Sequence, residues 1–158
     1  MTTYILDNWG EFRNALERTL SLAEDGVCVF DADLAQLGFQ QATCIEQLQR
    51  LLVGNPAASI RIALKRVDHL HRDHPRLIQL LTHHSHAVQV QQIHENLAHL
   101  RETIVISDAR HAVIRFDQDS PRSKLILAAP LEVAPYRKRF EDIWREGGEA
   151  FSPTQLGL

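Results

Sequence analysis

One short segment limits the possible folds of this chain more than any other. Residues 26–31 read Gly-Val-Cys-Val-Phe-Asp, a β-branched and aromatic run with almost no alternation of apolar and polar residues. Such a run is typical of a strand that is buried on both faces of its sheet. The sequence therefore predicts an α/β protein in which helices flank a β-sheet on both faces.

Apolar residues on either side of this strand recur at the three- and four-residue spacing of amphipathic helices. Asp7 or Asn8 suits the cap of the first helix, and Pro75 suits the first turn of the third. The predicted helices are residues 8–24, 39–52 and 74–83, and a last helix that begins at Glu132 or Pro135 and ends at Arg145.

Further strand-like runs follow the first one. A polar, His-rich segment, residues 65–73, comes directly after the first of these runs and is expected to be a loop at its carboxyl end. The last breaks are short enough for antiparallel neighbours, so the sheet is expected to be mixed. The further predicted strands are residues 59–64, 87–93, 103–107, 111–116 and 124–128.

The length of 158 residues favours a single domain, residues 1–158, because it suffices for one shared core and is short for two. Its core is expected to span residues 26–146, and Gly147-Gly148 is expected to start a flexible tail, residues 147–158.

The formal net charge of −3 and a pI near 6.3 argue against a strongly basic nucleic-acid-binding surface. The amino-terminal residues do not resemble a signal peptide, and no apolar stretch is long enough to span a bilayer, so a cytoplasmic protein without membrane insertion is expected. Cys28 and Cys44 are expected to be reduced, buried residues.

The segment Arg101-Glu-Thr-Ile-Val-Ile-Ser-Asp108, followed by Ala-Arg-His-Ala-Val-Ile-Arg-Phe116, resembles the core of one half of the phospholipase D superfamily. Residues 60–64 look like that family's second strand, and Phe140-Glu-Asp-Ile-Trp144 looks like its closing helix. The resemblance covers about residues 26–146, and it implies a phospholipase D-like mixed sheet.

The same resemblance implies that the catalytic motif is degenerate. The family's strand opens with His-x-Lys and closes with Asp, but Arg101 and Thr103 hold the first two positions before Asp108. Using His99 and Arg101 instead places Asp108 nine residues from the histidine rather than seven. The small Gly-Ser-x-Asn segment of the family reads Arg115-Phe-Asp-Gln118 here.

These departures predict a non-catalytic domain that acts as a binding or accessory module of unknown ligand. A homodimer is expected, paired through the face where active members join their half-sites. The sequence also resembles an uncharacterised bacterial domain family that occurs in proteobacteria alone or beside an acetyltransferase domain, which makes an acetyltransferase a possible partner.

Two other functions stay open. A residual phosphodiesterase or phosphotransfer hydrolase would use His99 or His111 near Asp108. Weak binding of nucleic acid or another phosphate-containing or anionic ligand would use an Arg-rich rim, although solvated charges at strand ends explain the same residues. The candidate anion-binding residues are Arg101, Thr103, Arg110 and Arg115, with Arg122 and Lys124 added for nucleic acid.

Most of the nine histidines lie between His69 and His99, so a metal site has to be weighed. His69, His71 and His74 are weak candidates because loop histidines lack the spacing of a zinc motif. Asp31 and Asp33 follow the first buried strand and are read as turn and helix-cap residues rather than as magnesium ligands. Neither a metal nor a cofactor is expected.

Overall fold

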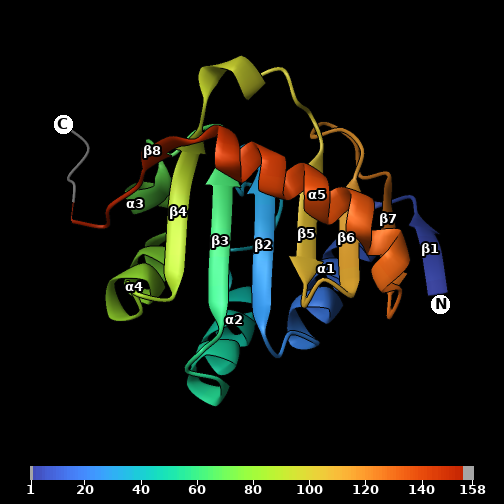
Figure 1. The fold of residues 1–158 in the computed structure, drawn as a ribbon, viewed down its shortest axis with the longest axis horizontal. Coiled ribbons are helices and arrows are strands. Elements are labelled where there is room, and N and C mark those ends of the chain that lie inside the picture. Colours follow the sequence, from blue (N-terminus) through green and yellow to red (C-terminus); the bar gives the residue numbers. More distant parts are fainter. Residues whose placement is uncertain (1, 155–158) are drawn as a thin grey trace.

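A computed structural model describes residues 2–154, which form one eight-stranded mixed sheet with helices on both faces (Figure 1). The order of strands across the sheet is β1-β7-β6-β5-β2-β3-β4-β8. The strands are β1 (Thr2–Leu6), β2 (Gly26–Asp31), β3 (Ser59–Leu64), β4 (Val88–Ile93), β5 (Thr103–Ser107), β6 (His111–Arg115), β7 (Ser123–Leu127) and β8 (Gly148–Ala150).

Strands β2, β3 and β4 are parallel, as helical crossovers require, whereas all other pairs are antiparallel. Strand β5 runs against β2 and continues as a meander through β6 and β7. Asp108 and Ala109 join β5 to β6 with φ values of 58° and 56°, the backbone of a type I′ hairpin turn.

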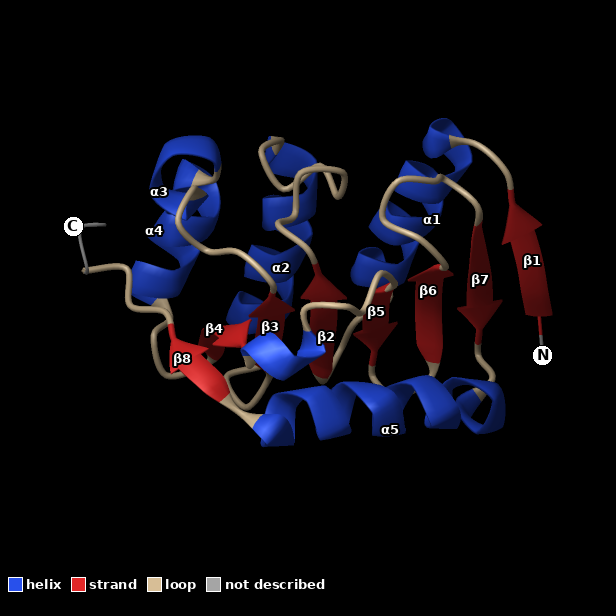
Figure 2. Cartoon of the chain, turned by 90° about the horizontal axis from the view of Figure 1, so that it is seen from above, coloured by secondary structure: helices blue, strands red, loops and turns tan. Residues whose placement is uncertain are grey.

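The helices form two layers on the sheet, seen edge-on in Figure 2. Helix α5 alone crosses one face, and the other long helices cover the opposite face. The helices are α1 (Trp9–Ser21), α2 (Ala42–Gly54), α3 (Leu70–Asp73), α4 (Pro75–His83) and α5 (Pro130–Glu146), with a 3₁₀ turn η1 (Glu95–Leu97) before β5. No helix among residues 2–154 is both long and apolar enough to cross a membrane.

Each layer encloses its own apolar core. Phe12, Leu48 and Leu77 pack on the face covered by α1, α2 and α4. Phe30 and Phe140 pack beneath α5 on the other face. The α/β class, the mixed sheet and the cover on both faces are as the sequence predicts.

The structure differs from the sequence prediction at both sheet edges. Strand β1 was not expected, because its five residues show no clear pattern of their own and it is defined by pairing with β7. The predicted flexible tail begins instead with strand β8, which pairs with β4. A Cβ on Gly148 would lie 1.7 Å from the carbonyl oxygen of Gln92, so this pairing requires glycine. Residues 155–158 of that tail lie outside the described residues.

Candidate functional site

The candidate site lies at one end of the central strands, where β2, β3 and β6 end and β5 begins. Because β5 is antiparallel to both β2 and β6, its first residue, Thr103, is paired with Arg115 at the end of β6. Asp31, the last residue of β2, lies beside both. Three residues far apart in the sequence therefore meet at this end of the strands.

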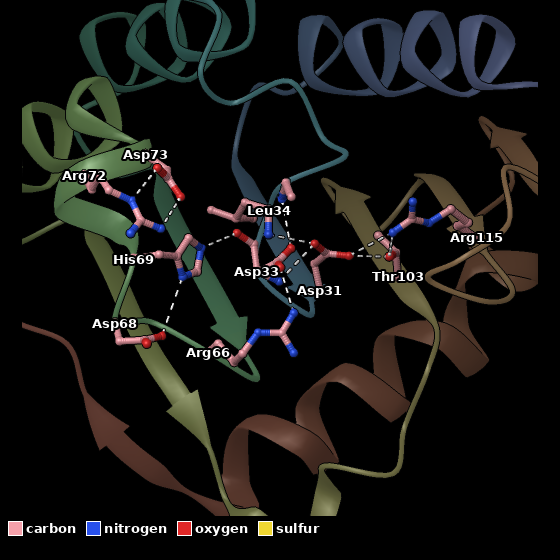
Figure 3. A network of polar contacts seen from close by, with 11 residues as sticks. Asp31, Asp33, Leu34, Arg66, Asp68, His69, Arg72, Asp73, Thr103 and Arg115 are labelled. Carbon is pink, nitrogen blue, oxygen red and sulfur yellow. Dashed lines mark hydrogen bonds and ion pairs between the residues drawn. The ribbon is translucent and has the colours of Figure 1, made fainter.

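Asp31, Thr103 and Arg115 form a buried polar cluster (Figure 3). Thr103 Oγ1 donates to Asp31 Oδ1, and Arg115 Nη2 lies 3.2 Å from Asp31 Oδ1 and 2.9 Å from Thr103 Oγ1. All three residues are at most 1% exposed. Burial lowers the pKa of Arg115, and the carboxylate of Asp31 counteracts that shift.

Aromatic rings complete the surroundings of Arg115. Its guanidinium carbon lies 5.1 Å from the ring centroids of both Trp9 and Phe12, within the range of cation–π attraction. Within residues 2–154, its Nε and Nη1 atoms have no hydrogen-bond partner. The guanidinium is thus paired on one side and unpartnered on the other.

The second oxygen of Asp31 holds the loop after β2. Asp31 Oδ2 accepts hydrogen bonds from the amides of Asp33 at 3.3 Å and Leu34 at 2.8 Å, and Asp33 Oδ1 accepts one from Ala35 at 3.0 Å. Leu34 has a φ of 69°, a conformation that costs energy for a side chain of its kind and that this capping stabilises. Both carboxylates thus act as turn caps.

From Asp33 the polar network continues toward the His-rich segment (Figure 3). Arg66 Nη2 lies 2.7 Å from Asp33 Oδ2, and His69 Nε2 lies 2.8 Å from the carbonyl oxygen of Asp33. The ring of His69 is also 5.6 Å from that of His74. Figure 3 shows Asp33, Arg66 and His69 near the carboxyl ends of the parallel strands.

The three candidate metal ligands do not converge on a common point. The ring of His71 packs against Phe151, with ring centroids 5.5 Å apart, whereas His69 and His74 face the loop after β2. No group of three or more His, Cys, Asp or Glu side chains in the described chain is arranged to hold a metal ion. The His-rich segment instead connects α4 to the polar network.

Arg101 is the residue that the sequence resemblance aligns with the first catalytic position of the phospholipase D superfamily. Its guanidinium forms paired hydrogen bonds with Asp117 at 2.9 and 3.1 Å and a further ion pair with Asp119. These carboxylates raise the pKa of Arg101, and Arg101 lowers the pKa of Asp117 to about 2. Unlike Arg115, Arg101 is solvent-exposed.

Asp108, Arg110 and His111 lie at the opposite end of the strands, at the turn between β5 and β6. The five residues of β5 separate them from Arg101 by on the order of 15 Å, at about 3.3 Å per residue. Asp108 accepts hydrogen bonds from the amides of Glu24, Asp25 and Gly26 at 2.8–3.1 Å. Its carboxylate therefore fixes the start of β2.

The two candidate histidines are separated in the same way. His99 is exposed in the loop before β5, whereas His111 follows the far end of β5. His111 Nδ1 accepts a hydrogen bond from the amide of Ala128 at 2.9 Å, and burial lowers its pKa. Thus Asp108 lies near His111 and far from His99 within one subunit.

A small cavity of about 140 Å³ opens beside the buried cluster. It lies between the loop after β2 and the loop that joins β6 to β7. At about 30 Å³ per water in the liquid, it has room for a few waters or a small ion. Its charged or amide-bearing lining residues are Asp31, Asp33, Gln36, Arg66, Arg115, Gln118 and Asp119.

The sequence alone does not predict that Asp31 pairs with Arg115. It also does not predict that the cations after β3, Lys65 and Arg66, belong to the site. The signal for the first was a charged residue at the end of a fully apolar strand, because a buried carboxylate requires a partner. Lys65 and Arg66 belong to residues 65–73, which the sequence predicts only as a polar loop. Burial lowers the pKa of Lys65, and the neighbouring charges of Arg101 and Arg66 lower it further.

Comparisons with known proteins agree with this architecture. Residues 9–152 match a family described as "Domain of unknown function (DUF7931)". The chain belongs to the DUF7931 family. No curated protein matches the sequence.

Solved structures show the fold of this DUF7931 domain at very low identity. Nuc from Salmonella typhimurium, a phospholipase D family member, has a TM-score of 0.65 and 9% identity, covering 96% of this chain and 98% of its own. Phosphatidylserine synthase from Haemophilus influenzae has a TM-score of 0.63 and 11% identity, covering 98% and 41%.

A third similar structure is TrmBL2, described as an archaeal chromatin protein with a novel mode of DNA binding. Its TM-score is 0.69 at 9% identity, and the match covers 94% of the DUF7931 chain. The chain spans about half of TrmBL2, 54% of its length. These likenesses establish a phospholipase D-like fold for the chain.

Proposed function

We propose that this DUF7931 domain is a non-catalytic phospholipase D-like binding or accessory module. The observation that carries the proposal is the buried cluster of Asp31, Thr103 and Arg115. Thr103 stands where the resemblance would place a catalytic lysine. It is fully buried and hydrogen-bonded to both members of the Asp31–Arg115 ion pair. A permanently protonated guanidinium at position 101 does not attack phosphorus.

The arrangement of the two histidines supports the same proposal. His99 and His111 are at opposite ends of β5, so one subunit does not bring them to a common substrate. Nucleophilic attack with leaving-group protonation needs both groups within hydrogen-bond reach of the reacting atoms.

Hydrolysis of bis(p-nitrophenyl) phosphate tests the absence of catalysis. We expect no rate above buffer and no phosphohistidine after incubation with substrate. His99→Ala and His111→Ala are the decisive variants, since cleavage abolished by either one, with the fold intact by circular dichroism, would show a residual hydrolase.

The geometry gives less support to nucleic-acid binding through the predicted rim. Arg110 is at the other end of β5 from Arg101, and Arg115 is buried. Arg101 is paired with two carboxylates, and Lys124 lies 4.9 Å from the ring centroid of Tyr136. A phosphate backbone requires a continuous track of available cations, which these residues do not form.

The homodimer and the acetyltransferase partner stay predictions. A dimer that pairs through the candidate-site end of the strands would place two copies of Arg101 and its acidic partners near one another. Sedimentation velocity over a range of concentrations would measure the oligomeric state. A single monomer peak at high micromolar concentration would contradict the dimer.

A further inference from the structure

Residues 117–121, in the loop between β6 and β7, are attached to the rest of the molecule by one arginine. Asp117 and Asp119 both pair with Arg101. Within the described chain, no other hydrogen bond or ion pair of residues 117–121 reaches beyond the loop. Asp119 is 78% exposed at its side chain, so this attachment is accessible to solvent and to competing ions.

The charges in and beside the cavity balance only because this loop is in place. The cations are Lys65, Arg66, Arg101 and Arg115. The carboxylates are Asp31, Asp33, Asp117 and Asp119. If the loop moved away, four cations would face two carboxylates, and the site would attract an anion. Glu102 and Arg139 nearby neutralise each other at 2.9 Å.

Two of these cations have unused binding capacity. Arg115, in the cavity wall, is 1% exposed and leaves its Nε and Nη1 atoms unpartnered. Lys65 makes no ion pair within residues 2–154, and its charged form is disfavoured by burial and by Arg101 and Arg66. An unpartnered buried donor and a crowded ammonium group both gain energy from an added negative charge.

We propose that the β6–β7 loop is an acidic latch on an oxyanion site. In the closed state Asp117 and Asp119 occupy Arg101, and a phosphate or carboxylate group displaces them to bind between Arg101, Lys65 and the cavity wall at Arg115. The inference rests on the proposed binding function and names its ligand class. With the loop in place, the cavity of about 140 Å³ already has room for a small oxyanion.

Isothermal titration with inorganic phosphate tests the latch. The double variant Asp117→Asn/Asp119→Asn keeps side-chain size and removes both charges. A latch that leaves about a tenth of the molecules open weakens apparent affinity about tenfold. We therefore expect the double variant to bind phosphate at least about tenfold more tightly than the parent chain.

Matched variants separate the latch from a general charge effect. Asp7→Asn removes the other acidic partner of the loop, which lies 3.9 Å from Arg122, and should leave phosphate binding unchanged. Arg101→Gln in the double-variant background should abolish the gained affinity. In the double variant, NMR titration of Lys65 should show a higher pKa when phosphate is present.

Acetate, titrated in parallel, identifies the source of the oxyanion. Tightening for phosphate alone assigns a phosphoryl group, and equal tightening for both assigns any small oxyanion. The proposal is overturned if the double variant binds neither anion more tightly, or if Arg101→Gln leaves the gain intact. Phosphodiester cleavage would instead refute the non-catalytic function, so the two failures are distinguishable.

Discussion

At the scale of single residues, the carboxylate of Asp31, at the end of β2, is buried in the protein interior. Asp31 would be a solvated turn residue in most loops, but here it is 1% exposed and pairs with Arg115 and Thr103. A buried ion pair is a poor source of net stability, yet breaking it leaves one charge without a partner. Once Asp31 or Arg115 is buried in the cluster, the other is needed to balance its charge.

Replacing Arg115 should therefore be strongly destabilising. Arg115→Met keeps much of the apolar contact with Trp9 and Phe12 but leaves the Asp31 carboxylate buried and unpaired. We expect a loss of about 3–5 kcal/mol in the free energy of unfolding, measured by urea denaturation.

Two further variants control this measurement. Arg110→Met, at the exposed hairpin turn, should change stability by less than about 0.5 kcal/mol. Adding Asp31→Asn to Arg115→Met should recover part of the loss, because a neutral amide is cheaper to bury than a carboxylate. Equal stability of Arg115→Met and the parent chain would rule out a structural role for the cluster.

At the scale of elements, α3 and α4 are connected to the candidate site through histidines. His74 stands at their junction, fully buried, and burial together with the nearby charge of His69 lowers its pKa. The carboxylates of Asp73 and Asp33 favour the charged form without reversing that shift. The neutral imidazole is therefore the form that fits the folded state.

This burial predicts a loss of stability in mild acid. Below the ordinary histidine pKa of about 6.5, His74 is protonated in the unfolded chain but stays neutral in the folded one. The free energy of unfolding therefore decreases as the pH decreases. The decline continues down to the lowered pKa of the folded state. Urea denaturation of the parent chain and His74→Leu between pH 8 and pH 5 measures this difference.

The variant should lose part of the decline, whereas His83→Gln at the exposed end of α4 should retain all of it. His111 contributes a decline of the same sign, because burial lowers its pKa too, and that contribution is common to all three proteins. Identical pH profiles for the parent chain and His74→Leu would contradict the prediction.

Elements with their own periodic pattern were predictable, and those defined by distant partners were not. Strands β2, β3 and β5 have the predicted bounds because the apolar runs of β2 and β5 and the alternating run of β3 each end at or directly before a polar residue. Strands β1 and β8 exist through pairing with β7 and β4, which no local pattern encodes. Arg101, Thr103 and Arg115 were found as site candidates, but their acidic partners lie 16 to 84 residues away in sequence.

At the scale of the whole molecule, one helix protects an entire face of the sheet. Phe140 in α5 is fully buried and stacks on Trp144 at 5.9 Å between ring centroids. Arg61 of β3 lies against both rings and pairs with Glu141, which ties the helix to the centre of the sheet. The second core therefore depends on the cover that this one helix provides.

Phe140→Ala should cost about 3–5 kcal/mol of unfolding free energy, because it opens a cavity under the one covering helix. Leu131→Ala on the same helix, at a residue that is 91% exposed, should stay within about 0.5 kcal/mol of the parent chain. Thermal and urea denaturation measure both. A similar small effect of the two variants would contradict the importance of this cover.

The position of α5 in the chain has a consequence for synthesis. Strands β2, β5 and β6 are complete by residue 115, whereas the helix that covers them ends at Glu146. Until that helix leaves the ribosome, Phe30, Ile104 and Ile114 lack their apolar cover. Exposed apolar strands favour aggregation, so the nascent chain passes through an interval in which these strands are open to aggregation and to chaperone binding.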